Sequence, residues 1–391
     1  MSEWEEKTLG DLITLKRGYD LPERLREEGT VPIYSSSGLS GFHSTSKVEP
    51  LGVVTGRYGS IGSVFLCTEP YWPLNTTLYV QDFKGSDAVF IYYFLQKFNW
   101  HQFNDKSAVP GVNRNDLHAE PIVVPPIAEQ KQIAAVLTCL DRKIENLRKQ
   151  NETLEAIAQT LFKHWFIDFE FPNADGKPYK SSGGAMEPSE LGKIPEGWRV
   201  GKLEDFCTIF RGSSPRPITS PIFFKDGSIP WIKIADATKS NSIYLSETKE
   251  FCTEAALPHT RLLKKGSLIL SNSATVGIPM ILNLDGCIHD GWLSFRDYKG
   301  ITRNFLFFVL TNKLQFLTKY ADGTVQKNLN TGILKNMDFV VADHSLIQEF
   351  TAIVKALFDK ILINEQQIQT LTKTRDALLP KLMSGQLRIT E

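Results

Sequence analysis

Residues 133–165 read IAAVLTCLDRKIENLRKQNETLEAIAQTLFKHW, and apolar side chains recur along them at alternating steps of four and three residues. Asn151 fills the one slot of this pattern that is not apolar. An alternation held over more than four heptads is typical of a coiled-coil helix. Residues 350–382, FTAIVKALFDKILINEQQIQTLTKTRDALLPKL, repeat the alternation, with Asn364 and Arg375 in two of the slots. The sequence therefore predicts two long coiled-coil helices.

The alternative to a coiled coil is an ordinary amphipathic helix packed on its own domain. Such a helix would show a wider apolar face and drift toward a period of about 3.6 residues. The narrow seams favour pairing, and we expect the two helices to run antiparallel in the register that sets Asn151 against Asn364. A buried amide pair specifies alignment at some cost in stability. In this register Arg375 falls opposite Leu140, so we expect its long side chain to reach toward a helix end.

Much of the remaining chain occurs twice. TLKRG (14–18) returns as TIFRG (208–212), at an offset of 194 residues. PIVV (121–124) returns as DFVV (338–341), at an offset of 217 residues. The growing offset indicates that the second copy carries loop insertions. Self-similarity on this scale predicts two related domains.

Each copy begins with short apolar runs broken by Gly, Pro, Ser and Asn, which indicates short strands, turns and a few short helices. Each copy ends in one of the long helices. We therefore predict an α+β fold, with two related globular domains of mixed strands and short helices joined by an antiparallel coiled coil. The expected domains are residues 1–127 and 196–343, and the expected helices are 128–167 and 344–391. Residues 168–195, rich in Pro, Gly and Ser, are the expected linker.

The composition excludes several classes of protein. The 391 residues are 42% hydrophobic, too many for a disordered chain, and 44 Lys and Arg balance 44 Asp and Glu. This balance argues against a protein that coats DNA by general electrostatics, although it permits local basic patches. No run approaches the ~20 apolar residues of a membrane span and the N-terminus lacks signal-peptide features, so we expect a cytoplasmic protein. The five cysteines lie too far apart for a zinc site and are expected to be buried thiols.

The sequence contains none of the common catalytic motifs. The phosphate loop GxxxxGKS/T, the zinc helix HExxH and the GxSxG elbow are all missing. GRYGSIG (56–62) differs from a dinucleotide-binding loop in the spacing of its glycines. The histidines are scattered, and we interpret the neighbouring His289 and Asp290 as structural. The sequence predicts a binding protein that is not an enzyme.

Four segments carry a resemblance to a known family: PPIAEQKQI (125–133), LFKHWF (161–166), LGKIPEGW (191–198) and LLPKLMSGQL (378–387). Together with the duplicated plan they extend over the whole chain. The chain resembles the specificity subunit of type I restriction-modification systems. One departure lies at residues 342–348, which read ADHSLIQ where the family pattern has Pro-Pro followed by Glu-Gln. The second long helix therefore lacks the family's usual start.

The resemblance implies a DNA-recognition subunit with no catalysis of its own. In the family, two target-recognition domains each read one half of a bipartite sequence in double-stranded DNA, and the helices set the spacing. The helices also dock two modification (methyltransferase) subunits, which bind S-adenosylmethionine, and restriction subunits that use ATP join the complex. This chain itself would need no cofactor and no metal. The competing interpretation is a coiled-coil adaptor whose duplicated domains bind protein or RNA.

Three pairs of matched loops are the best candidates for DNA contact. The first pair places basic and small polar residues beside a glycine turn: Lys16, Arg17, Arg211 and Ser213. Phosphate contact is expected for Arg17 and Arg211. The second pair permits close backbone approach: Arg57, Tyr58, Ser60, Ser271, Asn272 and Ser273. The third is rich in amides that can bond adenine edges: Asn113, Arg114, Asn115, Gln326, Lys327, Asn328 and Asn330. For Arg17 and Arg211 the competing role is a plain surface charge, and for the other residues it is shaping or capping a turn.

Overall fold

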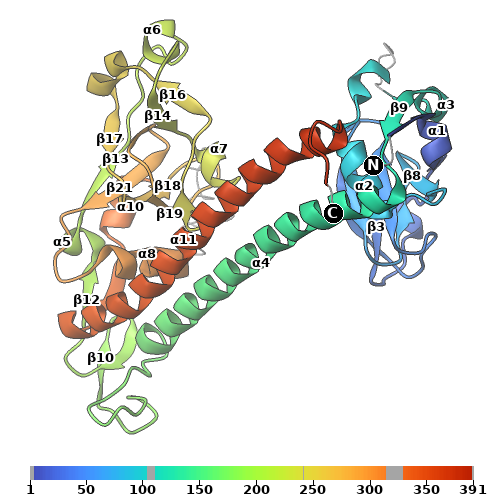
Figure 1. Cartoon of the computed structure of the whole chain (residues 1–391). Coiled ribbons are helices and arrows are strands. Elements are labelled where there is room, and N and C mark those ends of the chain that lie inside the picture. The colour runs from blue at the N-terminus through green and yellow to red at the C-terminus, as the bar shows by residue number, and fades with distance from the viewer. Residues whose placement is uncertain (1–3, 104–110, 241, 314–328, 390–391) are drawn as a thin grey trace. The chain divides into compact units, whose positions relative to one another are not determined.

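The structure of the protein is a computed structural model that describes residues 4–103, 111–240, 242–313 and 329–389 (Figure 1). The chain divides into two units. Unit 1 comprises residues 1–147 together with 366–391, and unit 2 comprises residues 148–365. Each long helix contributes one stretch to each unit.

Unit 1 is built from short strands and helices. Its strands are β1 (Glu5–Thr8), β2 (Thr14–Arg17), β3 (Val31–Ser35), β4 (Gly38–His43), β5 (Gly52–Gly56), β6 (Val64–Cys67), β7 (Trp72–Pro73), β8 (Thr77–Asp82) and β9 (Pro121–Val124). Its short helices are α1 (Leu9–Leu12), η1 (Glu23–Leu25), α2 (Ala88–Lys97), η2 (Trp100–Phe103) and α3 (Arg114–His118). One sheet has the strand order β2-β8-β5-β6, a second has the order β4-β3-β7, and β1 pairs with β9.

Unit 2 repeats this plan with additional elements. Its strands are β10 (Met186–Ser189), β11 (Gly192–Pro195), β12 (Arg199–Lys202), β13 (Thr208–Arg211), β14 (Ile229–Ile232), β15 (Tyr244–Leu245), β16 (Glu250–Cys252), β17 (Arg261–Leu263), β18 (Leu268–Ser271), β19 (Pro279–Leu282), β20 (Gly286–Ile288), β21 (Trp292–Arg296) and β22 (Asp338–Val341). Its short helices are α5 (Leu203–Phe206), α6 (Pro221–Phe224), α7 (Ile234–Ala237), η3 (Glu254–His259), α8 (Arg303–Asn312) and α10 (Thr331–Lys335). The sheets have the orders β13-β21-β18-β19-β15 and β16-β14-β20-β17, and the pairs β10-β11 and β12-β22 stand apart from them.

The internal repeat is confirmed strand by strand. In the β1–β9 pair Glu5 lies opposite Val124, and in the β12–β22 pair Arg199 lies opposite Val341, which are the equivalent positions of the two copies. The main sheets correspond as well, because β2-β8-β5-β6 matches β13-β21-β18-β19. Helices α2 and α8 start in the same way: the side chain of the preceding residue, Asp87 or Thr302, accepts a backbone N–H of the first turn. The two units are therefore related folds.

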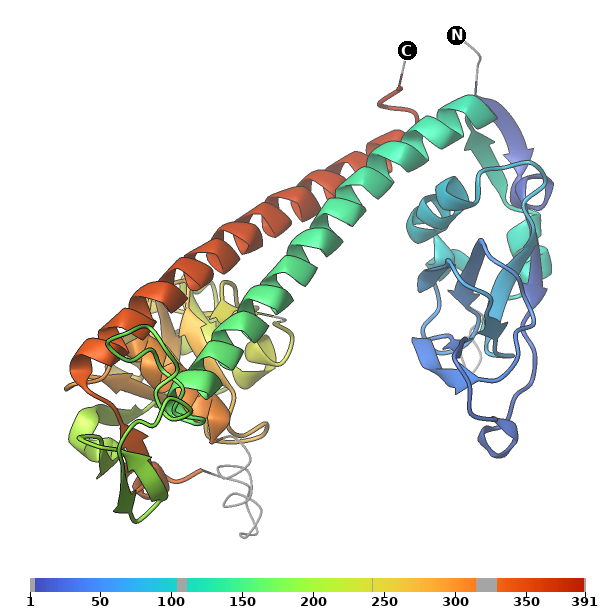
Figure 2. The ribbon, with the colours of Figure 1, turned by 90° about the horizontal axis from the view of Figure 1, so that it is seen from below.

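The two long helices are α4 (Ile127–Phe166) and α11 (His344–Met383), and they run antiparallel, side by side in both views (Figures 1 and 2). Within unit 1, one cluster of seam residues joins them: Ile144, Leu147, Ile368 and Leu371. Within unit 2, the two asparagines of the seams meet, and Asn364 donates to Asn151 over 2.8 Å. The antiparallel coiled coil expected from the heptads is confirmed.

The side chain of Arg375 does not make the contact that the heptad register predicts. Its guanidinium does not reach for a helix end but forms an ion pair with Asp141, with 2.7 Å between Nη1 and Oδ1. Tyr93 donates its hydroxyl proton to the other oxygen of Asp141. A neighbouring carboxylate stabilises a half-buried cation. For Arg375 this carboxylate belongs to Asp141, the residue after Leu140 in α4.

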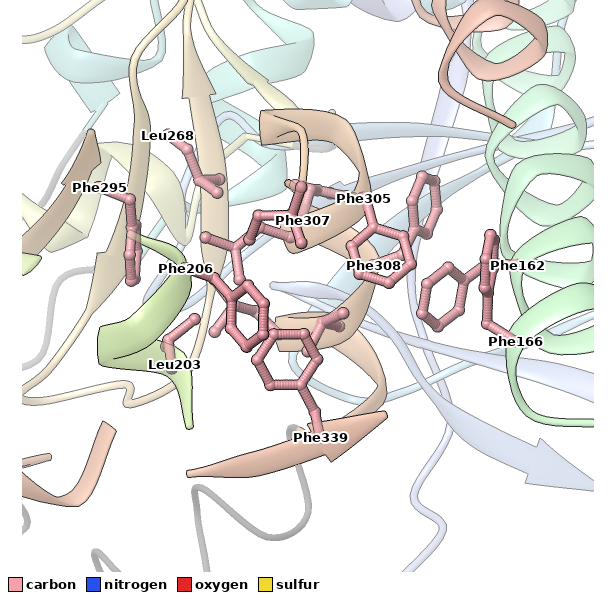
Figure 3. Close-up of a cluster of buried hydrophobic side chains, with 14 of the residues drawn as sticks. Phe162, Phe166, Leu203, Phe206, Leu268, Phe295, Phe305, Phe307, Phe308 and Phe339 are labelled. Carbon is pink, nitrogen blue, oxygen red and sulfur yellow. The ribbon is translucent and has the colours of Figure 1, made fainter. Parts of the chain in front are cut away.

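The core of unit 2 is rich in aromatic rings that come from three helices. Phe162 and Phe166 project from α4 toward Phe305 and Phe308 of α8, as Figure 3 shows. The ring centroids of Phe166 and Phe305 lie 4.9 Å apart, and those of Phe162 and Phe308 lie 5.5 Å apart. Phe350 of α11 closes the cluster, 5.1 Å from Phe166. These edge and stacked contacts attach the end of the coiled coil to the sheet domain of unit 2.

The start of α4 is fixed in unit 1 by a buried carboxylate. Glu129 accepts hydrogen bonds from the indole of Trp4 and, over 2.7 Å, from the guanidinium of Arg388, so residues near both ends of the chain meet there. Gln130 accepts from the backbone N–H of Asp87 and donates to the carbonyl of Pro125. Buried polar groups need such partners, which explains physically why Glu-Gln follows Pro-Pro at this helix start.

Residues 168–195, the expected linker, contain regular structure. Strands β10 and β11 form a hairpin, and the ring of Phe171 stacks on Tyr179 and on Trp198.

Of the five cysteines, four are buried, but Cys139 is exposed because position 139 lies between two seam positions on the outer side of α4. Among the described residues, none of the helices is long and apolar enough to cross a membrane.

Candidate nucleic-acid interface

Three strand ends of unit 1 meet at one edge of its main sheet. Strand β2 ends at Arg17 and β5 ends at Gly56, while β8, which lies between them, begins at Thr77. The register confirms the alignment, since Arg17 pairs with Leu78 and Gly56 with Thr77. The residues after β2 and β5 and those before β8 therefore lie next to one another.

A fourth segment of unit 1 joins this edge. The backbone N–H of Val112 donates to the carbonyl of Arg57 over 3.1 Å, and Tyr58 forms an isolated β-bridge with Gly111. A Cβ atom on Gly111 would lie 2.4 Å from the ring of Tyr58, so a larger residue there would have to displace this ring. We call residues 16–20, 56–60, 75–77 and 111–115 the loop edge of unit 1.

Unit 2 builds the same edge from equivalent positions. Strand β13 ends at Arg211, β18 ends at Ser271 and β21 begins at Trp292, and these three strands are neighbours in the sheet. The backbone N–H of Leu329 donates to the carbonyl of Asn272 over 2.7 Å, which matches the bond between Val112 and Arg57. We call residues 210–216, 271–275, 289–292 and 329–330 the loop edge of unit 2.

A glycine follows the basic residue of the first loop in both units for the same steric reason. A Cβ atom on Gly18 would lie 2.2 Å from the carbonyl oxygen of Leu74, and one on Gly212 would lie 2.1 Å from that of His289. Such distances are shorter than real Cβ contacts, so a larger residue would push the two segments apart. The turn that carries Arg17 or Arg211 is thus held tightly against the neighbouring backbone.

Basic side chains at the loop edge of unit 1 lie over aromatic rings. The guanidinium of Arg57 is centred 4.5 Å from the ring of Tyr58, and the ammonium of Lys16 is 5.9 Å from that of Tyr19. Arg17 is exposed and lies 3.7 Å from Asp20. Ser60 is exposed in the second loop. These side chains are brought together at one edge, as the matched loops predict.

The amides of the third loops cap helices. Asn113 accepts the backbone N–H of Asn115 over 3.0 Å at the start of α3, and Asn330 accepts that of Gly332 over 2.8 Å at the start of α10. Their side-chain oxygens thus play the turn-capping role. Arg114 and Asn115 are exposed in the first turn of α3. The predicted sites Gln326, Lys327 and Asn328 lie outside the described residues.

The second loop of unit 2 is more buried than its sequence indicates. Ser271 is fully buried, and its hydroxyl donates to Thr275 and accepts from the backbone of Ile278. Asn272 is 3% exposed and its amide lies 3.4 Å from the carbonyl of Asp290. These contacts favour a loop-shaping role for both residues, whereas Ser273 is half-buried at the rim.

The first loop of unit 2 is held by polar contacts. The hydroxyl of Ser213 donates to the carbonyl of His259 over 3.0 Å. The guanidinium of Arg211 donates through Nε to the backbone carbonyl of Asp290 over 2.8 Å. Arg211 and Ser213 are both exposed, so they remain accessible at the edge.

Sequence reasoning missed Asp290 as a member of the interface. Its carboxylate accepts the hydroxyl of Ser214 over 2.7 Å and lies 3.2 Å from the guanidinium of Arg216. Burial raises the pKa of Asp290, but the hydrogen bond from Ser214 and the nearby His289 and Arg216 outweigh this, so the pKa lies below its ordinary value. The signal was available, because alignment of the two copies sets Asp290 in the turn before β21, beside Arg211.

Two further arginines lie over the ring of Phe210. The guanidinium of Arg261 lies 4.7 Å from the ring centre of Phe210, and that of Arg296 lies 3.6 Å from it. Arg261 also donates to the carbonyl of Arg211. Arg261 thus lies with Arg211 and Arg216 in a chain whose formal net charge is zero. Arg296 instead lies opposite Thr208 at the other end of β21 and pairs with Asp297. Guanidinium groups in such a cluster suit phosphate oxygens.

The family of the chain follows from comparison with known proteins. The model for the type I restriction modification DNA specificity domain matches residues 1–156 and 195–373. The chain belongs to this family. It is 30% identical over 338 residues to the type I restriction enzyme MjaIX specificity subunit of Methanocaldococcus jannaschii, covering 82% of this chain and 74% of that protein.

Further relatives agree with this assignment. The type I restriction enzyme HindI specificity subunit of Haemophilus influenzae is 25% identical over 334 residues, which is 71% of either chain. Among solved structures, the S subunit of a type I restriction-modification system from M. genitalium has a TM-score of 0.65 at 18% identity. That alignment covers 99% of this chain and 97% of the other, so the fold is shared along the whole length. Specificity subunits are the non-catalytic members of these systems, and the competing adaptor interpretation is not favoured.

Proposed function

We propose that this chain recognises a bipartite sequence in double-stranded DNA, with the loop edge of each unit reading one half. The observation that carries the proposal is the duplication of the edge itself. In each unit the backbone N–H after the first loop's basic residue donates to the strand between the loops: Gly18 to Thr77 and Gly212 to Trp292. Two copies of one surface that have diverged in side chains suit two different half-sites.

Within each edge the side chains divide by what they can contact. Arg17, Arg57 and Arg114 in unit 1, and Arg211 and Arg216 in unit 2, carry charge suited to phosphate. The exposed amides of Asn115 and Asn330 are the candidates for adenine edges, since a cap uses only the oxygen of Asn330. Ser271 and Asn272 would set the shape of their loop instead of touching DNA.

We propose that the two long helices set the distance between the half-sites. A helix rises about 1.5 Å per residue and a DNA base pair about 3.4 Å, so helix length converts directly into spacer length. The hydrogen-bonded Asn151 and Asn364 would fix the register on which this conversion depends.

We propose two modification (methyltransferase) subunits and the restriction subunits as protein partners. The outer faces of the long helices offer equivalent apolar sites: Val136 on α4 is 39% exposed and Ile353 on α11 is 41% exposed, at the same position of the two copies. Because the two side chains occupy the same position of the two copies, we place one modification subunit at each of them. S-adenosylmethionine and ATP would bind to those partners, and the complex would act in the cytoplasm.

The experiment that tests the proposal is co-expression of this chain with its modification subunit, followed by mapping of methylated adenines in the DNA of the cells. DNA recognition predicts methylation confined to one motif of two specified parts separated by an unspecified spacer. Methylation without any common motif would contradict it.

A further inference from the structure

Each loop edge contains one bridging carboxylate, and the two bridges join equivalent places. In unit 2, Asp290 in the turn before β21 accepts the hydroxyl of Ser214, which lies in the turn after β13. In unit 1, Asp20 in the turn after β2 accepts the side-chain amide of Asn75, which lies in the turn before β8. Ser214 follows Asp20 by 194 residues, and Asp290 follows Asn75 by 215 residues.

The hydrogen bond between the two turns is therefore kept in both units, but the carboxylate lies in the turn after the edge strand in unit 1 and in the turn before the central strand in unit 2. A carboxylate in one turn faces a neutral hydrogen-bond donor in the other, and the two units place the carboxylate on opposite partners. An acid at the centre of a surface that attracts phosphate is unfavourable by plain Coulomb repulsion. Its presence in both units calls for a compensating contact within each edge.

The compensating contact in both units is an arginine. Asp20 lies 3.7 Å from the guanidinium of Arg17, and Asp290 lies 3.2 Å from that of Arg216. The backbone carbonyl of Asp290 also accepts Nε of Arg211, which is the equivalent of Arg17. Exposed ion pairs of this kind add little to stability, and a guanidinium has five donors, so one partner leaves others for a second oxygen ligand.

We infer that Asp20 and Asp290 are positioning residues, which hold the arginines of their loop edges in place for contact with DNA phosphates. The inference rests on the proposed function and deepens it. The bridge fixes the turn before the central strand to the turn after the edge strand, and the second contact of the carboxylate orients the guanidinium. Preorganised arginines lose less conformational freedom when DNA binds.

The test uses the full chain in complex with its modification subunits and two duplexes, one with the mapped motif and one without it. Dissociation constants are measured for D290N and for the double variant S214D/D290N, which rebuilds in unit 2 the arrangement of unit 1. Positioning predicts that D290N weakens binding to the motif about tenfold while binding to the other duplex is unchanged or tighter. The double variant returns binding of the motif to near the wild-type value.

Plain electrostatics predicts the opposite sign, because removal of an acid raises the positive charge of the surface. The matched control is D285N, which removes an exposed acid of unit 2 that pairs with Lys264 and lies outside the loop edge; it should bind like the wild type. Thermal unfolding of each complex separates misfolding from lost contact. D20N should act in the same way on the other half-site.

Three outcomes overturn the inference. Motif binding by D290N that is as tight as, or tighter than, wild-type binding overturns it, because either result assigns the carboxylate no positioning role. Failure of a folded S214D/D290N variant to regain affinity also overturns it, since the bridge of unit 1 would then be no substitute. If the wild-type complex discriminates between the duplexes and D290N discriminates as strongly as the wild type, only the inference fails; if the wild type does not discriminate, the proposed function fails with it.

Discussion

The side-chain amide of Asn364 donates to the side-chain oxygen of Asn151 over 2.8 Å inside the antiparallel pair of long helices. Asn151 in turn donates to the carboxylate of Glu365 over 2.8 Å. Asn364 is fully buried, and its own side-chain oxygen lacks a hydrogen-bond partner among the described residues. The pair therefore specifies alignment at an energetic cost, because a buried oxygen without a partner is unfavourable.

Replacing both asparagines by leucine should raise thermal stability while loosening the register. The double variant N151L/N364L continues the apolar seam and removes the unpartnered oxygen, which we expect to add about 1 kcal/mol. The single variant N151L leaves Asn364 buried without its acceptor and should lose about 1–3 kcal/mol. Thermal unfolding of the three proteins measures both effects. A double variant less stable than the wild type would contradict this view of the pair.

Stability of unit 2 should depend on pH through Glu155. Burial raises the pKa of Glu155 to about 7, against a donated backbone hydrogen bond from Ile243 that lowers it. The folded unit therefore keeps a proton that the unfolded chain loses above its ordinary pKa of 4.5. Stability should fall as the pH rises from about 4.5 to about 7 and then level off.

The variant E155Q should remove this dependence and unfold at a higher temperature than the wild type at pH 8. Glutamine can still accept the hydrogen bond from Ile243 but carries no charge to desolvate. E349Q, at an exposed position of α11 in the same unit, is the matched control and should keep the wild-type profile. Equal slopes for E155Q and the wild type between pH 5 and pH 7 would refute the assignment.

Partner binding should be lost one subunit at a time. V136E and I353E each place a charge in one of the two equivalent apolar sites on α4 and α11, and each should reduce the bound modification subunits from two to one. Native mass spectrometry of the purified complex counts them. Q159E, at an exposed polar position of α4, is the control. Two bound subunits in both glutamate variants would place the docking surface elsewhere.

Shortening both helices by one heptad should shorten the spacer of the recognised motif. Removal of residues 140–146 together with 369–375 deletes Asp141 and Arg375 as a pair and keeps Asn151 opposite Asn364. Seven residues correspond to about 10 Å, so the spacer should lose about three base pairs. Methylation mapping with the shortened chain measures the spacer. An unchanged spacer would show that the helices do not set it.

The periodic and repeated features of the fold could be predicted from the sequence. Heptads determine which faces of α4 and α11 meet, and the paired Asn151 and Asn364 leave one sensible register. The contact of Arg375 with Asp141 could not be predicted, because a seam pattern gives the facing residue, Leu140, and not the side chain beside it. The exposure of Cys139 follows from its helix position once the bounds of the helix are known.

The orientation of the loop side chains could not be predicted from the sequence. The repeat placed Arg17 and Arg211, or Arg57 and Asn272, at equivalent points, and the structure brings these loops together. Whether a loop side chain points outward or supports its own turn depends on contacts across the sheet, such as that of Asn272 with Asp290. Ser271 and Ser60 occupy the same loop of the two copies, yet one is buried and the other exposed. A single sequence does not carry that difference.

The most direct test of the central claim is adenine-methylation mapping with variants confined to one loop edge. N115D changes unit 1 alone and N330D changes unit 2 alone; each removes the side-chain NH₂ proposed to contact a base, and N330D keeps the oxygen that caps α10. The wild-type chain supplies the reference motif. Recognition of one half-site by each unit predicts one bipartite motif, with the first variant relaxing or losing one half and the second variant the other half. Methylation of the same complete motif at the same level by all three chains would contradict it.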